Sequence, residues 1–445
     1  MTFKDLRGET LSTVHEASAL AYNQTLDLLN SYRADPVAVL TPALEKDPDF
    51  ISGHLLMGGM MLATYDPQMN APALASLESA SASPLAPTGR EQSLHAALRV
   101  WAQGDMNEGN QRLDRHLIDH PRDLLALQLA HTADLALGRT TMLRDRIARV
   151  LPAWSESDAG YGYVLGMQAF GLEECFAYEQ AEALGRRAVA LQPHDTWAIH
   201  AVAHVCEMQG RAADGIQWMN ATRRAWEANN GLAVHNHWHL ALMHLARGDH
   251  ADALALYDQA VAPSPTALAL DLADASALLW RLAMRGVEVG SRWSSLAQRW
   301  RAQGRFGAVG FLDVHAALTF AAAGDDEGMT QLVRAAIAAE SRPGAHAEWS
   351  AVAIPARDAI AAMVAGQHAR CVDLLLPVLP VAQALGGSHA QRDLLTLTAQ
   401  EAARRCGQHA MASALQAQRQ VHHLPILPLD AAKNWRLAER RTTPA

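Results

Sequence analysis

The stretch DTWAIHAVAHVCEMQGRAADGIQWMNATRRAW, residues 195–226, indicates the fold of this chain. Its first half reads as an apolar helix that leads into a glycine turn at Gly210, and its second half reads as another helix with alanines at close-packing positions. Alanine and leucine dominate the whole composition while β-branched residues are sparse, which favours helix. The stretch therefore predicts a helix-turn-helix hairpin.

The same pattern of helix, glycine turn and helix recurs along the chain. Turns are expected at Gly104, Gly138, Gly171, Gly210, Gly248, Gly324, Gly366 and Gly407, with a fainter one near Gly286. Where the signal is clear they are about 34 to 42 residues apart, which is the period of helix-turn-helix repeats. The sequence predicts an all-α fold: one superhelical, tetratricopeptide-like solenoid domain over residues 1–445, with about nine helical hairpins.

Two segments differ from the repeats. Residues 71–89, APALASLESASASPLAPTG, are expected to be a Ser/Pro-rich interruption. Residues 422–445, which begin HHLPILPLD, are expected to be an extended C-terminal tail rather than another repeat, because prolines break the helical pattern.

Charge and hydropathy exclude several classes of partner. The formal net charge is -9, and no segment gathers the lysines and arginines that a nucleic acid or an anionic membrane would need. The N-terminus, MTFKDLRGET, lacks the order of a signal peptide, and no uncharged apolar run approaches the length of a membrane span. We therefore expect a cytoplasmic protein with no nucleic-acid and no membrane partner.

Sequence motifs narrow the chemistry further. The four cysteines, Cys175, Cys206, Cys371 and Cys406, lie far apart without a C-x-x-C pair, so neither a disulfide framework nor a thiolate zinc site is indicated. The chain has no Walker A loop, no G-x-G-x-x-G fingerprint, no G-x-S-x-G elbow and no H-E-x-x-H helix. No nucleotide cofactor is expected.

Two pairs of histidines are the strongest functional signal. His200 and His204 are four residues apart and therefore share one helix face, to which Glu207 returns one turn later. The next concave helix repeats the spacing with His235 and His239. Because the first helix of each hairpin lines the inside of a superhelix, these polar stripes predict a central polar pocket that holds a small-molecule ligand.

Three interpretations of these histidines stay open. They could hold a divalent metal such as zinc, iron or manganese, with Glu207 or Glu174 as an oxygen ligand or general base. They could form a metal-free catalytic or ligand-binding pocket, or they could only hydrogen-bond to neighbouring helices and water. His200 and Glu207 are separated by about 10 Å of helix rise, so one helix alone cannot hold an ion with both.

The run GGSHAQRD, residues 386–393, is a second candidate. Ser388 has the character of a helix N-cap, and Gln391, Arg392 and Asp393 follow in the first turn. Free backbone N–H groups and Arg392 could bind a carboxylate or phosphate of a ligand. The alternative is a capping motif with a local pair between Arg392 and Asp393.

Several runs together resemble the tetratricopeptide repeat protein 38 family, found in bacteria and animals. The runs are GMQAFGLEECFAYEQAE, DTWAIHAVAHVCEMQG, HNHWHLAL, FLDVHAAL and GGSHAQRDLL. The similarity extends roughly from DHPRDLLALQLAH to GGSHAQRD, and its most specific part combines H-x-x-x-H-x-x-E-M with H-N-x-W-H. It implies a shared internal site, but no particular reaction. The motif residues carried over to this chain are Glu174, Asp195, Trp197, His200, His204, Glu207, Met208, His235, Asn236, Trp238, His239, Asp313, His315, Ser388, Gln391, Arg392 and Asp393.

Two functions follow as hypotheses. The first is a small-molecule enzyme, a hydrolase or related acid–base catalyst, with His200, His204, Glu207, His235, His239 and Glu174 at its centre. The substrate would contact Asp195, Asn236, Trp238, Asp313, His315, Ser388, Gln391, Arg392 and Asp393. The second is a non-catalytic repeat scaffold that binds a peptide or protein. A homodimer is compatible with either.

Overall fold

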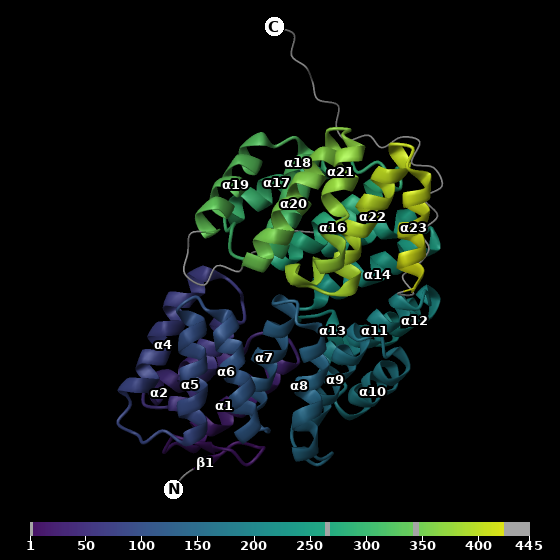
Figure 1. Ribbon diagram of the computed structural model, residues 1–445. Coiled ribbons are helices and arrows are strands. Elements are labelled where there is room, and N and C mark those ends of the chain that lie inside the picture. The colour runs from purple at the N-terminus through teal and green to yellow at the C-terminus, as the bar shows by residue number, and fades with distance from the viewer. Residues whose placement is uncertain (1–2, 263–267, 341–346, 422–445) are drawn as a thin grey trace. The chain divides into compact units, whose positions relative to one another are not determined.

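Helices make up almost the whole of this computed structural model, which describes residues 3–262, 268–340 and 347–421 (Figure 1). The two strands, β1 (Phe3–Lys4) and β2 (Thr10–Leu11), form a short antiparallel pair near the N-terminus. The all-α prediction is confirmed. The expected C-terminal tail at residues 422–445 lies outside the described residues.

The chain divides into two compact units. The first comprises Met1–Val202 and Thr222–Leu232, and the second comprises Ala203–Ala221 and Ala233–Ala445. The helices of the first unit are α1 (Glu16–Asn30), α2 (Pro36–Lys46), α3 (Ile51–Leu62), η1 (Pro67–Met69), α4 (Asn70–Ala82), α5 (Gly89–Ala102), α6 (Met106–Asp119), α7 (Leu124–Ala136), α8 (Thr140–Val150), η2 (Leu151–Ala153), α9 (Tyr161–Glu174), α10 (Tyr178–Leu191) and α13 (Arg223–Trp226).

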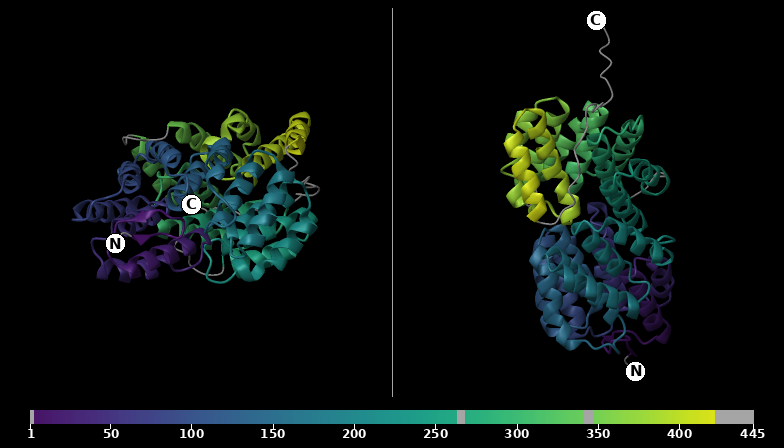
Figure 2. Two further views of the ribbon diagram at one scale, coloured as in Figure 1. Left: turned by 90° about the horizontal axis from the view of Figure 1, so that it is seen from below. Right: turned by 90° about the vertical axis from the view of Figure 1, so that its right-hand side faces the viewer.

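The second unit begins within a helix that both units share. Helix α11 (Thr196–Met208) is continuous, and the division falls after Val202. The other helices of the second unit are α12 (Ala212–Ala221), α14 (Ala233–Arg247), α15 (His250–Leu256), η3 (Tyr257–Val261), α16 (Ala269–Met284), α17 (Arg292–Gln303), α18 (Gly310–Ala323), α19 (Asp326–Glu340), α20 (Ala347–Val364), α21 (His368–Leu375), η4 (Leu379–Leu385), α22 (His389–Arg405) and α23 (His409–Val421). Figure 2 shows the helices of each unit from two further sides.

Most of the predicted turns are confirmed. Glycines with positive φ, a conformation that costs glycine little because it has no Cβ, lie in the expected connections between helices. They are Gly104, Gly138, Gly210, Gly248, Gly286, Gly324, Gly366 and Gly407. Helical hairpins therefore recur along the chain, and the fold is repeat-like.

The turn predicted at Gly171 is wrong. Gly171 lies inside α9, and the chain turns later, at Phe176, whose φ is 63°. A Cβ at position 171 would lie 2.4 Å from the carbonyl oxygen of Leu143 in α8. Gly171 is thus required by the close approach of two helices rather than by a turn.

The interruption predicted for residues 71–89 is mostly helical. Helix α4 covers Asn70–Ala82 and α5 begins at Gly89, so the non-helical part is residues 83–88. Ala73, Leu77 and Ala80 are buried and recur at helical spacing. This periodicity outweighs the Ser/Pro-rich composition on which the prediction rested.

Helix α16 is central to the second unit. It packs against α14, α18 and α22, and α22 lies far from it in the sequence. The indole Nε1 of Trp280 donates a hydrogen bond to Thr398 Oγ1 at 2.9 Å, and Ser276 and Thr319 hydroxyls are 2.7 Å apart. These buried hydrogen bonds hold α16 in register with α22 and α18.

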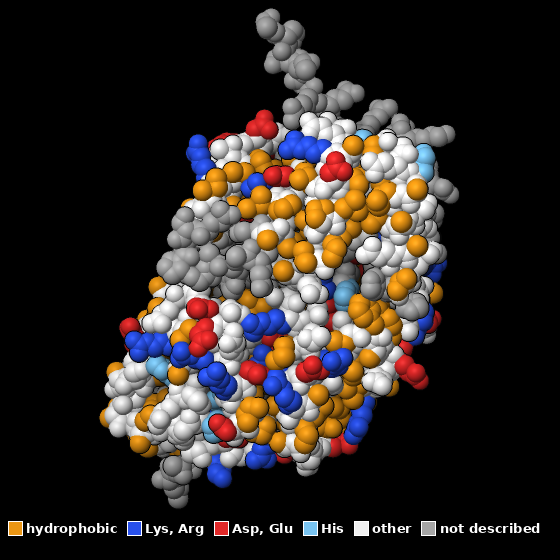
Figure 3. Space-filling model, viewed as in Figure 1, with side chains coloured by type: hydrophobic (Ala, Val, Ile, Leu, Met, Phe, Trp, Pro, Cys, Tyr) orange, Lys and Arg blue, Asp and Glu red, His pale blue; other side chains and the backbone are white. Residues whose placement is uncertain are grey.

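Within residues 3–262, 268–340 and 347–421, no single helix is long and apolar enough to cross a membrane. One bent pair, α21 with η4, passes a combined test of length and composition. On the face drawn in Figure 3, basic and acidic side chains of the described residues are interspersed rather than gathered by sign.

Candidate metal centre

Helices α11 and α14 supply the histidines that the sequence singled out. Asp195 starts α11, because its Oδ1 accepts a hydrogen bond of 2.9 Å from the backbone N–H of Ala198. His204 and Glu207 follow on this helix, and His235 and His239 lie one turn apart on α14. All four belong to the second unit.

A continuous chain of hydrogen-bonding groups joins two carboxylates through two imidazoles. His239 Nδ1 lies 2.8 Å from Glu207 Oε2, and His235 Nδ1 lies 2.8 Å from Asp274 Oδ2. Between the two rings, His239 Nε2 and His235 Nε2 are 3.2 Å apart. Glu207, His239 and Asp274 are buried, while His235 is partly exposed.

The carboxylates determine the tautomers of both rings. An ionised carboxylate can only accept, so each Nδ1 carries the proton and donates it. Each Nε2 then presents a lone pair, and the two lone pairs face each other across 3.2 Å. With one proton on each ring, a cation between the two nitrogens, either a proton or a metal ion, would make this contact favourable.

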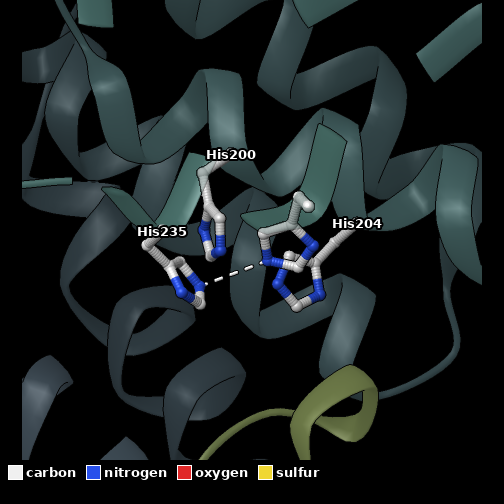
Figure 4. Close-up of side chains that lie close together, drawn as sticks. His200, His204 and His235 are labelled. Atoms are coloured by element: carbon white, nitrogen blue, oxygen red, sulfur yellow. Dashed lines mark hydrogen bonds between the residues drawn. The ribbon is translucent and has the colours of Figure 1, made fainter. Parts of the chain in front are cut away.

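A third imidazole joins this pair. The ring centroid of His204 lies 4.3 Å from that of His239. His200 lies one turn before His204 on the same helix, and one nitrogen from each of the rings of His204, His235 and His239 falls within 4.8 Å of the others. Figure 4 shows His204 and His235 turned toward one another.

The spacing matches metal coordination. Zinc–nitrogen bonds of about 2.0 to 2.1 Å at a tetrahedral angle place two ligand nitrogens about 3.3 Å apart. The observed separation of His239 Nε2 and His235 Nε2 is 3.2 Å. In addition, a carboxylate on the second nitrogen of a ligating histidine is the usual outer contact of such sites. The residues fit a first-row divalent ion.

Trp238 closes one side of this site. Its ring stacks on His235 at 5.3 Å between centroids and 14° between planes, and it meets His239 edge to face at 4.7 Å. Trp238 is fully buried. It therefore limits the rotation of both ligand rings and excludes water from that side.

His200 is held by aromatic rings of the first unit. Its ring stacks on Phe170 at 5.4 Å and contacts Trp197 at 4.9 Å. Trp197 Nε1 in turn donates to His131 Nε2 at 3.0 Å. Glu174, the remaining predicted catalytic residue, is buried at the C-terminal end of α9 beside Glu173, also in the first unit.

Asp195 and Asp313 take part in local backbone structure. Besides its contact to Ala198, Asp195 has an Oδ2 with no partner among the described residues, and burial raises its pKa to about 8. Both carboxylate oxygens of Asp313 accept from the N–H of Gly307 at 3.0 Å. Burial raises the pKa of Asp313 to about 7. Each aspartate thus organises backbone at its own helix start.

Two buried residues of the second unit keep polar atoms that no described residue satisfies. His315 Nδ1 donates to the carbonyl of Phe311 at 2.8 Å, which leaves the lone pair of Nε2 without a partner in the described chain. Burial lowers the pKa of His315 to about 4, so the ring is neutral. Both amide atoms of the fully buried Asn236 likewise meet no hydrogen-bonding partner there.

The run GGSHAQRD forms a helix cap. Ser388 N donates to Gln391 Oε1 at 2.9 Å and Gln391 N donates to Ser388 Oγ at 3.4 Å, which is a capping box. Arg392 donates to the carbonyl of Gly387. Asp393 pairs with Arg419 of α23 at 2.7 and 2.8 Å, so the expected local pair between Arg392 and Asp393 is wrong.

Sequence reasoning missed Asp274 and Arg281, both on α16. Asp274 orients His235, and Arg281 lies with its Cζ 5.5 Å from the centre of the Trp238 ring. One signal was available: both are charged residues within the largely apolar helix ALDLADASALLWRLAM. Charged residues in such a helix are costly unless partners or function retain them.

No family model matches this chain. The site is therefore interpreted from its own geometry.

Proposed function

We propose that this protein is a metal-dependent hydrolase that acts on a small molecule, with one divalent ion held by His204, His235 and His239. The main support is the hydrogen-bonded series Glu207–His239–His235–Asp274, in which the Nε2 atoms of the two histidines are 3.2 Å apart. Three imidazole ligands with one open position are typical of catalytic rather than structural zinc sites.

Each residue has a role in this proposal. Glu207 and Asp274 keep His239 and His235 in the tautomer that offers Nε2, and they increase the basicity of the ligand nitrogens. A bound ion would supply Lewis-acid chemistry, that is, activation of water and polarisation of the bond to be cleaved. Imidazole ligands suit zinc or iron better than manganese.

The burial of the site supports a small ligand over a peptide. His204 and His239 are both 0% exposed. An extended peptide bound along a repeat surface contacts accessible side chains and cannot reach these rings. The scaffold hypothesis accordingly explains neither the carboxylate partners nor the convergent nitrogens.

We also propose a finer architecture and setting. The recurring hairpins with positive-φ glycines support a tetratricopeptide-like solenoid, and the quoted motifs support membership of the tetratricopeptide repeat protein 38 family. The four cysteines are free thiols, which supports a reducing compartment such as the cytoplasm.

Metal analysis tests the proposal directly. Full-length protein incubated with zinc, iron(II) or manganese and then desalted is expected to retain about one ion per chain. The double variant His235→Ala/His239→Ala should retain almost none and should lose hydrolysis of whichever ester, amide or phosphate ester the native protein cleaves. His250→Ala, which changes a histidine at the start of α15, is the matched control and should behave as the native protein.

Circular dichroism must show that each variant remains helical. A folded native protein that retains none of the three metals, or a double variant that retains as much as the native protein, would refute the metal centre. A metal-free protein that still hydrolyses the substrate with His200 and His204 intact would instead point to a proton shared between His239 and His235.

A further inference from the structure

Arg281 differs from other buried arginines of the protein. Arg7, Arg90, Arg146 and Arg419 each form an ion pair of 2.7 to 3.0 Å with an aspartate. Arg281 is only 3% exposed, yet it forms no ion pair with any described residue. A buried cation without a counter-ion is costly, so its retention in an apolar helix calls for a partner.

The position of the Arg281 guanidinium is well defined. One terminal nitrogen donates to the carbonyl of Ala390 at 2.6 Å and the other to that of Ala277 at 3.4 Å. The guanidinium also lies over the ring of Trp238, with Cζ 5.5 Å from the ring centre. Of its five N–H groups, these contacts use two, and the other three meet no acceptor in the described part of the chain.

The carboxylates around Arg281 are already bound to other groups. Three carboxylates attract the Arg281 charge without touching it: Asp274, Glu207 and Asp393. Each of them is bound elsewhere, Asp274 to His235, Glu207 to His239 and Asp393 to Arg419. Burial therefore dominates and lowers the pKa of Arg281. An added anion would meet a pre-oriented donor with little competition from the protein.

Arg281 is adjacent to the candidate metal centre. The Trp238 ring that it covers stacks on His235 at 5.3 Å, so the guanidinium lies within about 11 Å of the His235 ring by way of that indole. Arg281 also follows Asp274 by seven residues, which is two helical turns and nearly the same face of α16. This separation suits the two ends of one small molecule.

Another unsatisfied donor lies in the same place. Trp238 Nε1 is buried and has no acceptor among the described residues. The indole N–H and the guanidinium are both donors, and an oxyanion can accept from both. Arg281 and Trp238, both buried beside the candidate metal centre, therefore lack an acceptor and a negative charge, which are the two properties of a carboxylate or phosphate.

We propose that Arg281, supported by Trp238, is an anion subsite that binds a carboxylate or phosphate group of the substrate beside the metal centre. The proposal rests on the proposed function, because it assigns the anionic group to the molecule that the metal centre cleaves. It narrows the substrate class to small anionic esters, amides or phosphate esters.

Calorimetric titration of the full-length, metal-free protein with inorganic phosphate, and separately with acetate, tests the subsite without using activity. Metal-free protein is chosen because anions also bind directly to metal ions. Binding of at least one anion is expected, and which one binds more tightly indicates whether the site takes a phosphate or a carboxylate. Arg281→Gln should weaken that binding at least about tenfold, since it removes the charge and the donor fork.

Arg301→Gln is the matched control, because Arg301 is a surface arginine of the same unit that pairs with Asp325 and Glu327. It should bind the anion as the native protein does. If Arg281→Gln does not fold, Arg281→Lys, which keeps the charge but loses the fork, should bind several-fold more weakly than the native protein.

Two results would overturn the subsite: a native protein that binds neither anion, or a folded Arg281 variant that binds as the native protein does. Metal retention is measured separately, on portions of the same preparations that are incubated with zinc and then desalted. A protein that retains no zinc but binds anion through Arg281 would refute the proposed function alone, and a protein that retains zinc but in its metal-free form binds no anion would refute the subsite alone.

Discussion

Each unit contains a buried cluster of charged groups, around Arg146 in the first unit and around His235 and His239 in the second, and these two clusters differ in how their polar atoms are satisfied. In the first unit, Arg146 donates to Asp134 at 2.9 and 3.1 Å and to Asn110 at 3.3 Å, and Asn110 donates back to Asp134 at 2.6 Å. Donors meet acceptors throughout. In the second unit, two ring nitrogens with lone pairs face each other, and Arg281 has no counter-ion among the described residues.

Under the proposals above, the first cluster is structural and the second is functional. A buried network in which donors match acceptors needs nothing from outside and adds rigidity. The second network, with converging ring nitrogens and a buried cation, is the one that the proposals complete with a metal ion and an anion. The predictions below ask whether the first cluster acts on stability alone and the second on binding.

The largest effect is expected from Asp134→Ala. Burial raises the pKa of Asp134 despite Arg146, so the pair itself contributes little, but removing Asp134 leaves the buried guanidinium of Arg146 with only the more exposed Asp114 as a counter-ion. The free energy of unfolding, measured by urea denaturation, should fall by about 3 to 5 kcal/mol. Asp114→Ala, which removes the more exposed partner of Arg146, should cost about 1 kcal/mol or less.

Metal content per folded molecule should not change in Asp134→Ala. If this variant loses the metal while its helical signal is retained, the two clusters are coupled and the comparison fails.

A smaller effect, dependent on pH, is expected from Asp195 in the first unit. Its pKa is raised to about 8 by burial, so the folded state favours the protonated form. The protonated Asp195 carboxyl contributes to the free energy of unfolding in full below the unfolded pKa of about 3.8, and this contribution is lost as pH rises toward 8. Asp195→Asn cannot ionise and can still accept from Ala198 through its amide oxygen.

Between pH 5 and pH 8.5, the free energy of unfolding of Asp195→Asn should therefore rise by a few kcal/mol relative to that of the native protein. Urea denaturation at both pH values measures this difference. Asp158→Asn, at a loop position of the same unit, serves as the control and should show no such difference. Parallel curves for Asp195→Asn and the native protein across this range would show that the Asp195 carboxyl is not held protonated.

The smallest effect is expected from Glu207→Gln and Asp274→Asn. Each change keeps the shape of the side chain but weakens the acceptor that orients a ligand histidine. Metal affinity, measured by competition with a chromogenic chelator, should fall about 10- to 100-fold for each variant, with little change in the melting temperature. Glu327→Gln, which changes an exposed carboxylate of the same unit that pairs with Arg301, is the control and should not alter the affinity.

Equal metal affinity in the native protein and in both variants would show that the two carboxylates do not support metal ligands. The second cluster would then be structural, like the first.

Part of the fold could be read from the chain because its causes are local. Positive-φ glycines mark the hairpin turns, and no long-range contact is needed to recognise them. The turn predicted at Gly171 is wrong for the opposite reason. The glycine is required by a long-range contact with the backbone of Leu143 in α8, and its neighbours in the sequence give no sign of that contact. The interruption predicted for residues 71–89 is mostly wrong because it rested on composition, whereas the helical spacing of Ala73, Leu77 and Ala80 indicates a helix.

The site shows the same division. The sequence by itself determined that His200 and His204, and His235 and His239, share helix faces, because helical periodicity places residues four apart on one side. Only the tertiary structure decided that Asp274 turns Nε2 of His235 toward His239, and that Arg281 lies against Trp238 without a counter-ion among the described residues. Those contacts depend on how α11, α14 and α16 pack, and packing between helices is set by side-chain complementarity across long stretches of chain rather than by any local pattern.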